Sequence, residues 1–197
     1  MLKLLFPLPR QLTVAFSGGL DSVAVADFLS RKHDIACAFF HHRTDNCDRA
    51  EEFVTRFCSE RGIPVHLGKI SIVPKPKQMS IEEYWRIERY QFLSTFGPVV
   101  TAHHLNDCVE TYIWGSMHGT PKVIPTVRDN VLRPFLTTPK AEFSKWCRQH
   151  NLEWCEDASN RNIQYTRNYI RHEMMPHVLK VNPGIDTMVK KIVEKQV

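Results

Sequence analysis

The sequence predicts a doubly wound α/β fold, with a mainly parallel five-stranded sheet and a short C-terminal helical tail. Short apolar segments alternate with amphipathic helical patterns up to about residue 150, which is typical of a parallel sheet covered on both faces. The chain of 197 residues is 43% hydrophobic and 24% charged, an ordinary composition for a soluble globular protein. No stretch approaches the roughly 18–20 apolar residues of a membrane span, so no membrane partner is expected.

Each expected element is bounded by a turn or capping signal. The five strands are predicted at residues 11–16, 35–40, 63–67, 99–102 and 131–136. The main helices are predicted directly after residue 19 and at 49–61, 81–96, 106–117, 139–150 and 165–178, with a short last helix after 184. Ser80 and Glu83 have capping-box spacing, and Thr138 with Pro139 predicts an N-cap followed by the first helical residue.

Charge and cysteine content restrict the classes of partner and compartment. A net charge of +5 and ten histidines permit a nucleic-acid partner, but they fit an ordinary solvated surface equally well. None of the six cysteines forms a C-x-x-C pair, as expected for reduced thiols in a cytoplasmic protein. The apolar start of the chain resembles a signal peptide only faintly, because Pro7 and Pro9 interrupt it. We therefore expect a cytoplasmic location.

The sharpest local pattern is the hexapeptide Ser17-Gly18-Gly19-Leu20-Asp21-Ser22, between a predicted strand and a predicted helix. Two glycines let the backbone approach an anion, and the free N–H groups at the helix start favour a phosphate. Asp21 would repel a phosphate unless a cation lay between them, so its presence favours Mg²⁺. The alternative is a purely structural Gly-Gly turn capped by Asp21.

Other candidate site residues follow strand ends or share a helix face. His41 follows the second predicted strand, while His103, His104, Asp107 and Glu110 follow the fourth. Spacings of three or four residues place Arg86 with Arg89, and Arg167 with Arg171, on single helix faces. The first pair suits a phosphate or a polyanion. Because the like charges of Arg167 and Arg171 repel at a spacing of four residues, an anion is expected beside the second pair. The alternatives are structural histidines and exposed, salt-bridged helix faces.

These motifs identify a resemblance. The hexapeptide resembles the pyrophosphate-binding loop of the N-type ATP pyrophosphatases, the PP-loop superfamily with an adenine nucleotide alpha hydrolase-like (HUP-type) fold. Over residues 12–180 the chain is similar to the tRNA(Ile)-lysidine synthetase family. It shows R-x-x-R-Y, T-A-H-H-x-x-D-x-x-E-T, Arg133-Pro134, and E-D-x-S-N followed by R-N-x-I-R in the family's order.

The resemblance implies a cytoplasmic ligase that uses ATP and Mg²⁺. Such an enzyme adenylates the 2-oxo group of the first anticodon cytidine of an isoleucine tRNA with a CAU anticodon, and L-lysine then displaces AMP. Residues 1–150 would form the catalytic domain, and residues 151–197 a tail that contributes to the site and to RNA contact. The sequence leaves open whether copies of the chain form a homo-oligomer.

The resemblance also implies a role for each matching residue. Ser17, Gly18, Gly19, Leu20, Asp21, Ser22 and His41 would bind ATP, and Asp21 with Asp107 would bind the metal ion. His103, Arg86 and Arg89 would act at the reacting groups, whereas Glu110 would act there or only brace its helix. Arg133, Arg167 and Arg171 would contact nucleotide or RNA.

Several departures from the family pattern keep alternatives open. Asn106 stands where the family usually has a first acid, Tyr84-Trp85 is bulkier than usual, and residues 119–130 lack a full glycine-rich stretch. The chain ends at residue 197, so we expect a minimal catalytic core without the usual C-terminal domains. One alternative is a PP-loop tRNA thiolase using Cys47 and Cys108. The other is a non-catalytic nucleotide- or RNA-binding relative.

Overall fold

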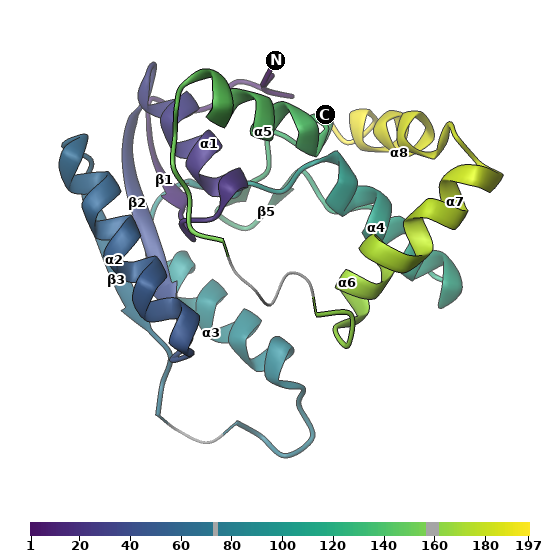
Figure 1. The fold of residues 1–197 in the computed structure, drawn as a ribbon, viewed down its shortest axis with the longest axis horizontal. Coiled ribbons are helices and arrows are strands. Elements are labelled where there is room, and N and C mark those ends of the chain that lie inside the picture. The colour runs from purple at the N-terminus through teal and green to yellow at the C-terminus, as the bar shows by residue number, and fades with distance from the viewer. Residues whose placement is uncertain (73–74, 157–161) are drawn as a thin grey trace.

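The computed structural model describes residues 1–72, 75–156 and 162–197, and its core is a twisted sheet with helices on both faces (Figure 1). The strand order is β3-β2-β1-β4-β6-β5, and every neighbouring pair is parallel except β5 with β6. The predicted doubly wound, mainly parallel fold is confirmed. The predicted strand number is wrong, because the sheet has six strands and not five.

The elements agree closely with the predicted order. The strands are β1 (Gln11–Ala15), β2 (Asp34–His41), β3 (Val65–Lys69), β4 (Val99–Val100), β5 (Val127–Arg128) and β6 (Val131–Leu132). The helices of the α/β core are α1 (Leu20–Ser30), α2 (Asp45–Glu60), α3 (Ile81–Ser94), α4 (Leu105–Met117) and α5 (Lys140–Gln149). The tail contains α6 (Thr166–Tyr169), a π-helical turn η2 (Ile170–Met174), α7 (Met175–Val181) and α8 (Ile185–Glu194).

The extra strand comes from a hairpin that the sequence pattern did not predict. The segment expected to be a turn-rich excursion supplies β5, and a two-residue turn leads into β6. Asp129 in this turn has φ 55°, a conformation that two-residue hairpins favour and that Asp and Asn tolerate. The strand predicted at 131–136 ends at Leu132, and Pro134 cannot donate to a strand ladder.

Several helix boundaries also differ from prediction. Helix α2 begins at Asp45, four residues before the predicted start, and α5 begins at Lys140 with Pro139 in the N-cap position. The single helix predicted at 165–178 is interrupted by η2 and continues to Val181. Local propensity does not specify such an interruption, because it depends on what the helix packs against.

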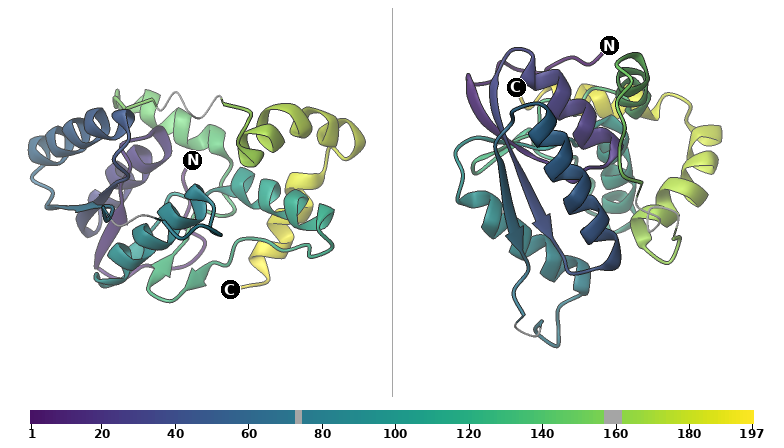
Figure 2. Two further views of the ribbon diagram at one scale, coloured as in Figure 1. Left: turned by 90° about the horizontal axis from the view of Figure 1, so that it is seen from below. Right: turned by 60° about the vertical axis from the view of Figure 1, so that its left-hand side comes forward.

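Two buried clusters position the helices. Alternate residues of β2, including Cys37 and Phe39, share the main core with α1, α2 and α5, whereas Ala38 packs with Leu93 of α3 on the opposite face. The tail helices share a second cluster with α4, which contains Leu105, Cys108, Val109, Ile113, Leu136, Ile170, Ile185, Val189 and Val193. Figure 2 shows the green and yellow tail on the α4 side of the molecule, away from α2 and β3. None of the described helices is long and apolar enough to cross a bilayer.

Close backbone packing at Gly115 in α4 generates a stability prediction. A Cβ there would lie 2.5 Å from the Thr120 carbonyl oxygen and 3.3 Å from the Lys122 amide nitrogen. Because backbone atoms cannot move aside cheaply, we expect Gly115→Ala to lower the free energy of unfolding by about 1–3 kcal/mol in urea titrations. Gly97→Ala is the control, since its Cβ would meet no described atom within 4 Å. Equal stability of the two variants would contradict this packing.

Candidate functional site

The loop between β1 and α1 has the geometry of an anion-binding turn. Gly18 has φ +78°, and a Cβ there would lie 3.1 Å from the Phe53 ring and 3.2 Å from a Val54 methyl carbon. Gly19 is the N-cap of α1 and offers no side chain to its first N–H groups. These N–H groups, at the positive end of the helix dipole, are therefore available to a ligand.

Short hydrogen bonds hold this loop in shape. Ser22 Oγ donates to the Gly19 carbonyl at 2.8 Å and lies 3.2 Å from Ser17 Oγ. The Cys155 amide donates to the Gly18 carbonyl at 2.9 Å, so the segment after α5 braces the outer side of the loop. Leu20 begins α1 and packs against the main core. The six residues predicted to form one phosphate site thus lie together, three in the turn and three in the first turn of α1.

Asp21 lies where three helices begin. Its Oδ2 is 3.6 Å from His104 Nε2, at the N-cap of α4, and 3.9 Å from Lys140 Nζ, in the first residue of α5. Its Oδ1 is buried and has no hydrogen-bond partner among the described residues. An orphaned carboxylate oxygen beside an anion-binding turn is a suitable ligand for a hard cation.

The adjacent histidines His103 and His104 have different environments. His104 is buried and forms a capping box: its Nδ1 accepts from the Asp107 amide at 3.3 Å, and its own amide donates to Asp107 Oδ2 at 3.0 Å. His104, a sequence candidate to which no role was assigned, lies 3.6 Å from Asp21. His103 Nδ1 lies 2.7 Å from Thr101 Oγ1. Burial lowers the pKa of His103 to about 3. The nearby arginines lower this pKa further, whereas the charge of Asp107 raises it.

Arginines from α3 and from the loop after β6 meet at one tyrosine. The guanidinium carbons of Arg86 and Arg89 lie 5.4 and 5.5 Å from the centre of the Tyr90 ring. Arg133 is buried and donates from one nitrogen to the Tyr90 hydroxyl at 3.3 Å and from another to the Pro125 carbonyl at 3.0 Å. Burial, together with the charges of Arg86 and Arg167, lowers the pKa of Arg89.

An ionic cluster joins α4 to the tail. Asp107 Oδ1 accepts from Arg167 at 2.6 Å and from Arg171 at 3.2 Å. Glu110 accepts from Arg167 Nε at 3.1 Å and from Arg171 Nε at 2.7 Å. The anion that the arginine spacing predicted is therefore this pair of carboxylates from the same chain. Both Asp107 oxygens are already bound, so this carboxylate fits a metal ion less well than Asp21 does.

The two histidines at the end of β2, His41 and His42, face opposite sides of the sheet. His41 is buried against α2, with Nε2 2.9 Å from Asp48 Oδ1 and Nδ1 accepting from the Arg43 amide at 2.9 Å. The ring of His42 lies 5.2 Å from that of Trp85 on α3. Burial, with Arg89 and His41 nearby, lowers the pKa of His42 to about 4. His42 thus lies beside Trp85 and Arg89 of α3, whereas His41, which is predicted to bind ATP, pairs with Asp48 of α2.

Asn106 connects the starts of α4 and α5, because its Oδ1 accepts from the Lys140 amide at 2.9 Å. The amide at this position therefore has a structural partner.

Asp157, Ser159 and Asn160 of the predicted E-D-x-S-N motif lie outside the described residues. Lys140 carried no sequence signal, since only the packing of α5 brings it to Asp21.

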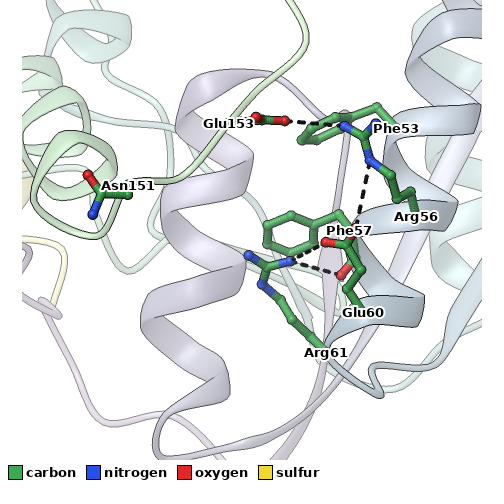
Figure 3. Close-up of a pocket in the computed structure, with 7 residues that line it drawn as sticks. All are labelled: Phe53, Arg56, Phe57, Glu60, Arg61, Asn151 and Glu153. Carbon is green, nitrogen blue, oxygen red and sulfur yellow. Dashed lines mark hydrogen bonds and ion pairs between the residues drawn. The ribbon is translucent and has the colours of Figure 1, made fainter.

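A cavity of about 370 Å³ lies away from these residues, between α2 and the segment after α5 (Figure 3). Arg61 lies over the Phe57 ring, 3.8 Å from its centre, and Arg56 pairs with Glu153 at 3.3 Å. The lining contains none of the predicted site residues and consists of Phe53, Arg56, Phe57, Glu60, Arg61, Asn151 and Glu153.

Comparisons with curated proteins show similarity to enzymes of tRNA modification. The tRNA(Ile)-lysidine synthase of Thermotoga maritima is 32% identical over 198 residues, covering 91% of this chain and 48% of the relative. The tRNA(Ile)-lysidine synthase of Haemophilus ducreyi is 31% identical, covering 94% of this chain and 46% of the relative. The bifunctional protein TilS/HprT of Listeria innocua is 32% identical, covering 94% and 32%. The chain thus spans about half, or less, of the length of these relatives.

A solved structure shares the fold. The NH₃-dependent NAD synthetase of Campylobacter jejuni superposes with a TM-score of 0.57 at 15% identity, covering 96% of this chain and 86% of that one. The family profile described as the PP-loop domain matches residues 3–178. With that match over most of its length, and with the Ser17–Ser22 turn formed between β1 and α1, the chain belongs to the PP-loop domain family.

Proposed function

We propose that this chain is the catalytic part of a tRNA(Ile)-lysidine synthase. The observation that carries the proposal is the uncapped start of α1 beside the orphaned Oδ1 of Asp21. The similarity to three curated enzymes of that activity supports it. The substrates would be ATP, an isoleucine tRNA with a CAU anticodon, and L-lysine.

The proposed reaction has two steps. First, O2 of the anticodon cytidine attacks the α-phosphorus of ATP, and pyrophosphate leaves. Then the lysine amine attacks C2, loses a proton, and AMP departs with the former 2-oxo oxygen. Adenylation is needed because the 2-oxo oxygen is otherwise a poor leaving group. Positioning and neutralisation of charge are what the protein contributes.

The residues of the turn would bind the diphosphate of ATP. The N–H groups at the start of α1 and the hydroxyls of Ser17 and Ser22 supply donors suited to phosphate oxygens. Asp21 is the residue that would hold Mg²⁺, which when bound would offset phosphate charge, and the orphaned Oδ1 fits that role. Asp107 would act mainly by fixing Arg167 and Arg171.

His103 and the arginines of α3 would act on the reacting groups. An imidazole with a pKa of about 3 stays neutral at pH 7, so it would orient a substrate by hydrogen bonding without adding charge. Arg86 and Arg89 would supply the positive charge. For RNA contact, half-exposed Arg167 is a better candidate than Arg133, which is buried against Tyr90. Through Arg167 and Arg171 the tail would contribute to the catalytic site.

The thiolase alternative finds less support. Cys108 is buried, and burial raises its pKa to about 12, so it carries a protonated and weakly nucleophilic thiol. Nucleoside mass spectrometry after incubating the chain with ATP, Mg²⁺, lysine and tRNA distinguishes the candidates. A lysine adduct on cytidine supports the proposal, and a sulfur replacement supports the thiolase. No modification, with no pyrophosphate release, supports the non-catalytic relative.

Replacement of Asp21 tests the assigned site. We expect Asp21→Asn to lower the rate of tRNA- and lysine-dependent pyrophosphate release at least about 100-fold, since an amide is a poor partner for a cation–phosphate pair. Asp27→Asn on the same helix is the control. Asp27 Oδ2 accepts from Trp146 Nε1 at 2.9 Å, so this variant should lose stability and keep activity. Full turnover by Asp21→Asn would remove Asp21 from the mechanism.

The low pKa of His103 makes stability depend on pH. In the unfolded chain this histidine binds a proton near pH 6.5, whereas in the folded chain it does so only near pH 3. Below about pH 6.5 the unfolded state therefore gains protons that the folded state does not. The free energy of unfolding should fall with pH, by up to about 1.4 kcal/mol per unit from this group.

Urea titrations at pH 7 and pH 5 measure this effect. His103→Gln should lose less stability than the wild type between these values, because glutamine does not titrate. His177→Gln, on an exposed part of α7, is the control and should behave like the wild type. An identical pH dependence for His103→Gln and wild type would mean that His103 titrates normally in the folded protein.

A further inference from the structure

The first residue of α5, Lys140, lies beside the phosphate turn although no motif selected it. Its Nζ is 3.9 Å from Asp21 Oδ2, and its side chain is 40% exposed. An ammonium paired with Asp21 and open to solvent is accessible to a ligand bound at the start of α1. The proposed reaction as described above gives it no role.

Several contacts fix the point from which Lys140 extends. Its amide donates to Asn106 Oδ1, and the Leu105 amide donates to the Thr138 carbonyl at 3.0 Å, so α4 and α5 begin side by side. Trp146 Nε1 donates to Asp27 of α1, which ties α5 to the helix that begins at the turn. Contacts with α1 and α4 therefore fix the position of the Lys140 backbone.

The positive charge around Asp21 is only partly balanced by its carboxylate. Asp21 lies in the first turn of α1, where the helix dipole is positive, and the full positive charge of Lys140 lies 3.9 Å from its Oδ2. Asp107 already accepts the N-cap amide of α4, so the carboxylate beside Lys140 is that of Asp21, whose Oδ1 is unpartnered among the described atoms. A site of this kind favours a further anion carrying several charges, and a diphosphate group has that chemistry.

We propose that Lys140 is a further phosphate-binding residue of this site, and that it binds the diphosphate of ATP that leaves as pyrophosphate. The inference rests on the proposed function. When the nucleotide enters, the ammonium exchanges its contact with Asp21 for phosphate oxygens. As the bond between the α-phosphorus and the bridging oxygen breaks, negative charge grows on the diphosphate, and Lys140 stabilises it. No bond to Lys140 forms, and its proton stays on Nζ.

The competing explanation is a purely structural ion pair with Asp21. Exposed pairs of this kind contribute little to stability. The structural explanation therefore predicts a small change in stability and no change in phosphate binding when Lys140 loses its charge. The proposal predicts that loss of this charge weakens phosphate binding. A binding measurement therefore separates the two explanations.

Calorimetric titration of the full chain with inorganic pyrophosphate in the presence of Mg²⁺ tests the proposal. Lys140→Met keeps the length of the side chain and removes its charge, and we expect it to weaken the Kd about 10- to 100-fold, as for loss of one charge-assisted hydrogen bond. Lys140→Arg should stay within about threefold of the wild type, because it retains the charge. Lys145→Met, on the exposed side of the same helix, is the matched control and should bind as the wild type does.

The outcomes separate this inference from the proposed function. Unchanged pyrophosphate binding by a folded Lys140→Met, with or without a change in stability, overturns the role of Lys140 and leaves the proposed function standing. Failure of the wild type to bind both pyrophosphate and ATP overturns the proposed function and this inference together. If Lys140→Met does not fold, Lys140→Gln gives the same comparison. In turnover, a lower kcat as well as a higher KM for ATP is expected of Lys140→Met.

Discussion

A carboxylate in the first turn of a helix is stabilised by the helix dipole, and Asp21 occupies such a place in α1, close to side chains from the starts of α4 and α5. The turn through Gly18 and Gly19 brings the chain to this point, and the capping box of His104 closes it on the α4 side. On the α5 side, the ammonium of Lys140 lies 3.9 Å from Asp21 Oδ2. Strands β1, β4 and β6 are parallel, so their carboxyl ends lie at the same end of the sheet. The segments that follow these strands therefore come together near Asp21.

The ionic cluster on α4 connects this edge to the tail. Asp107 and Glu110 are buried, and two arginines of the tail compensate their charges. Removing such partners would leave buried carboxylates unpaired, which typically costs about 3–5 kcal/mol. The tail is therefore held in place by charge as well as by its apolar cluster with α4. Asp107 takes part in both the capping box and this cluster, which links the position of the tail to that of His104.

Local sequence patterns predicted the features that depend on local physics. The Gly-Gly turn, the alternation of strands and helices, and the i, i+4 arginines are encoded within a few residues, and the structure contains all of them. Which histidine of an adjacent pair lies beside Asp21 depends on the cap geometry of the next helix, so the sequence listed His104 but assigned a role only to His103. The partner of Arg167 and Arg171 came from α4, some sixty residues away, which spacing within one helix cannot specify. The hairpin that adds β5 and the contact between Asn106 and Lys140 likewise depend on long-range packing.

The central claim is that the turn after β1 binds the diphosphate of ATP. A crystal structure of the chain grown with ATP and Mg²⁺ tests it most directly. The account predicts density for the diphosphate within hydrogen-bonding distance of the amides at the start of α1. Nucleotide density elsewhere, such as in the cavity beside Arg56 and Arg61, with the turn empty, would contradict it.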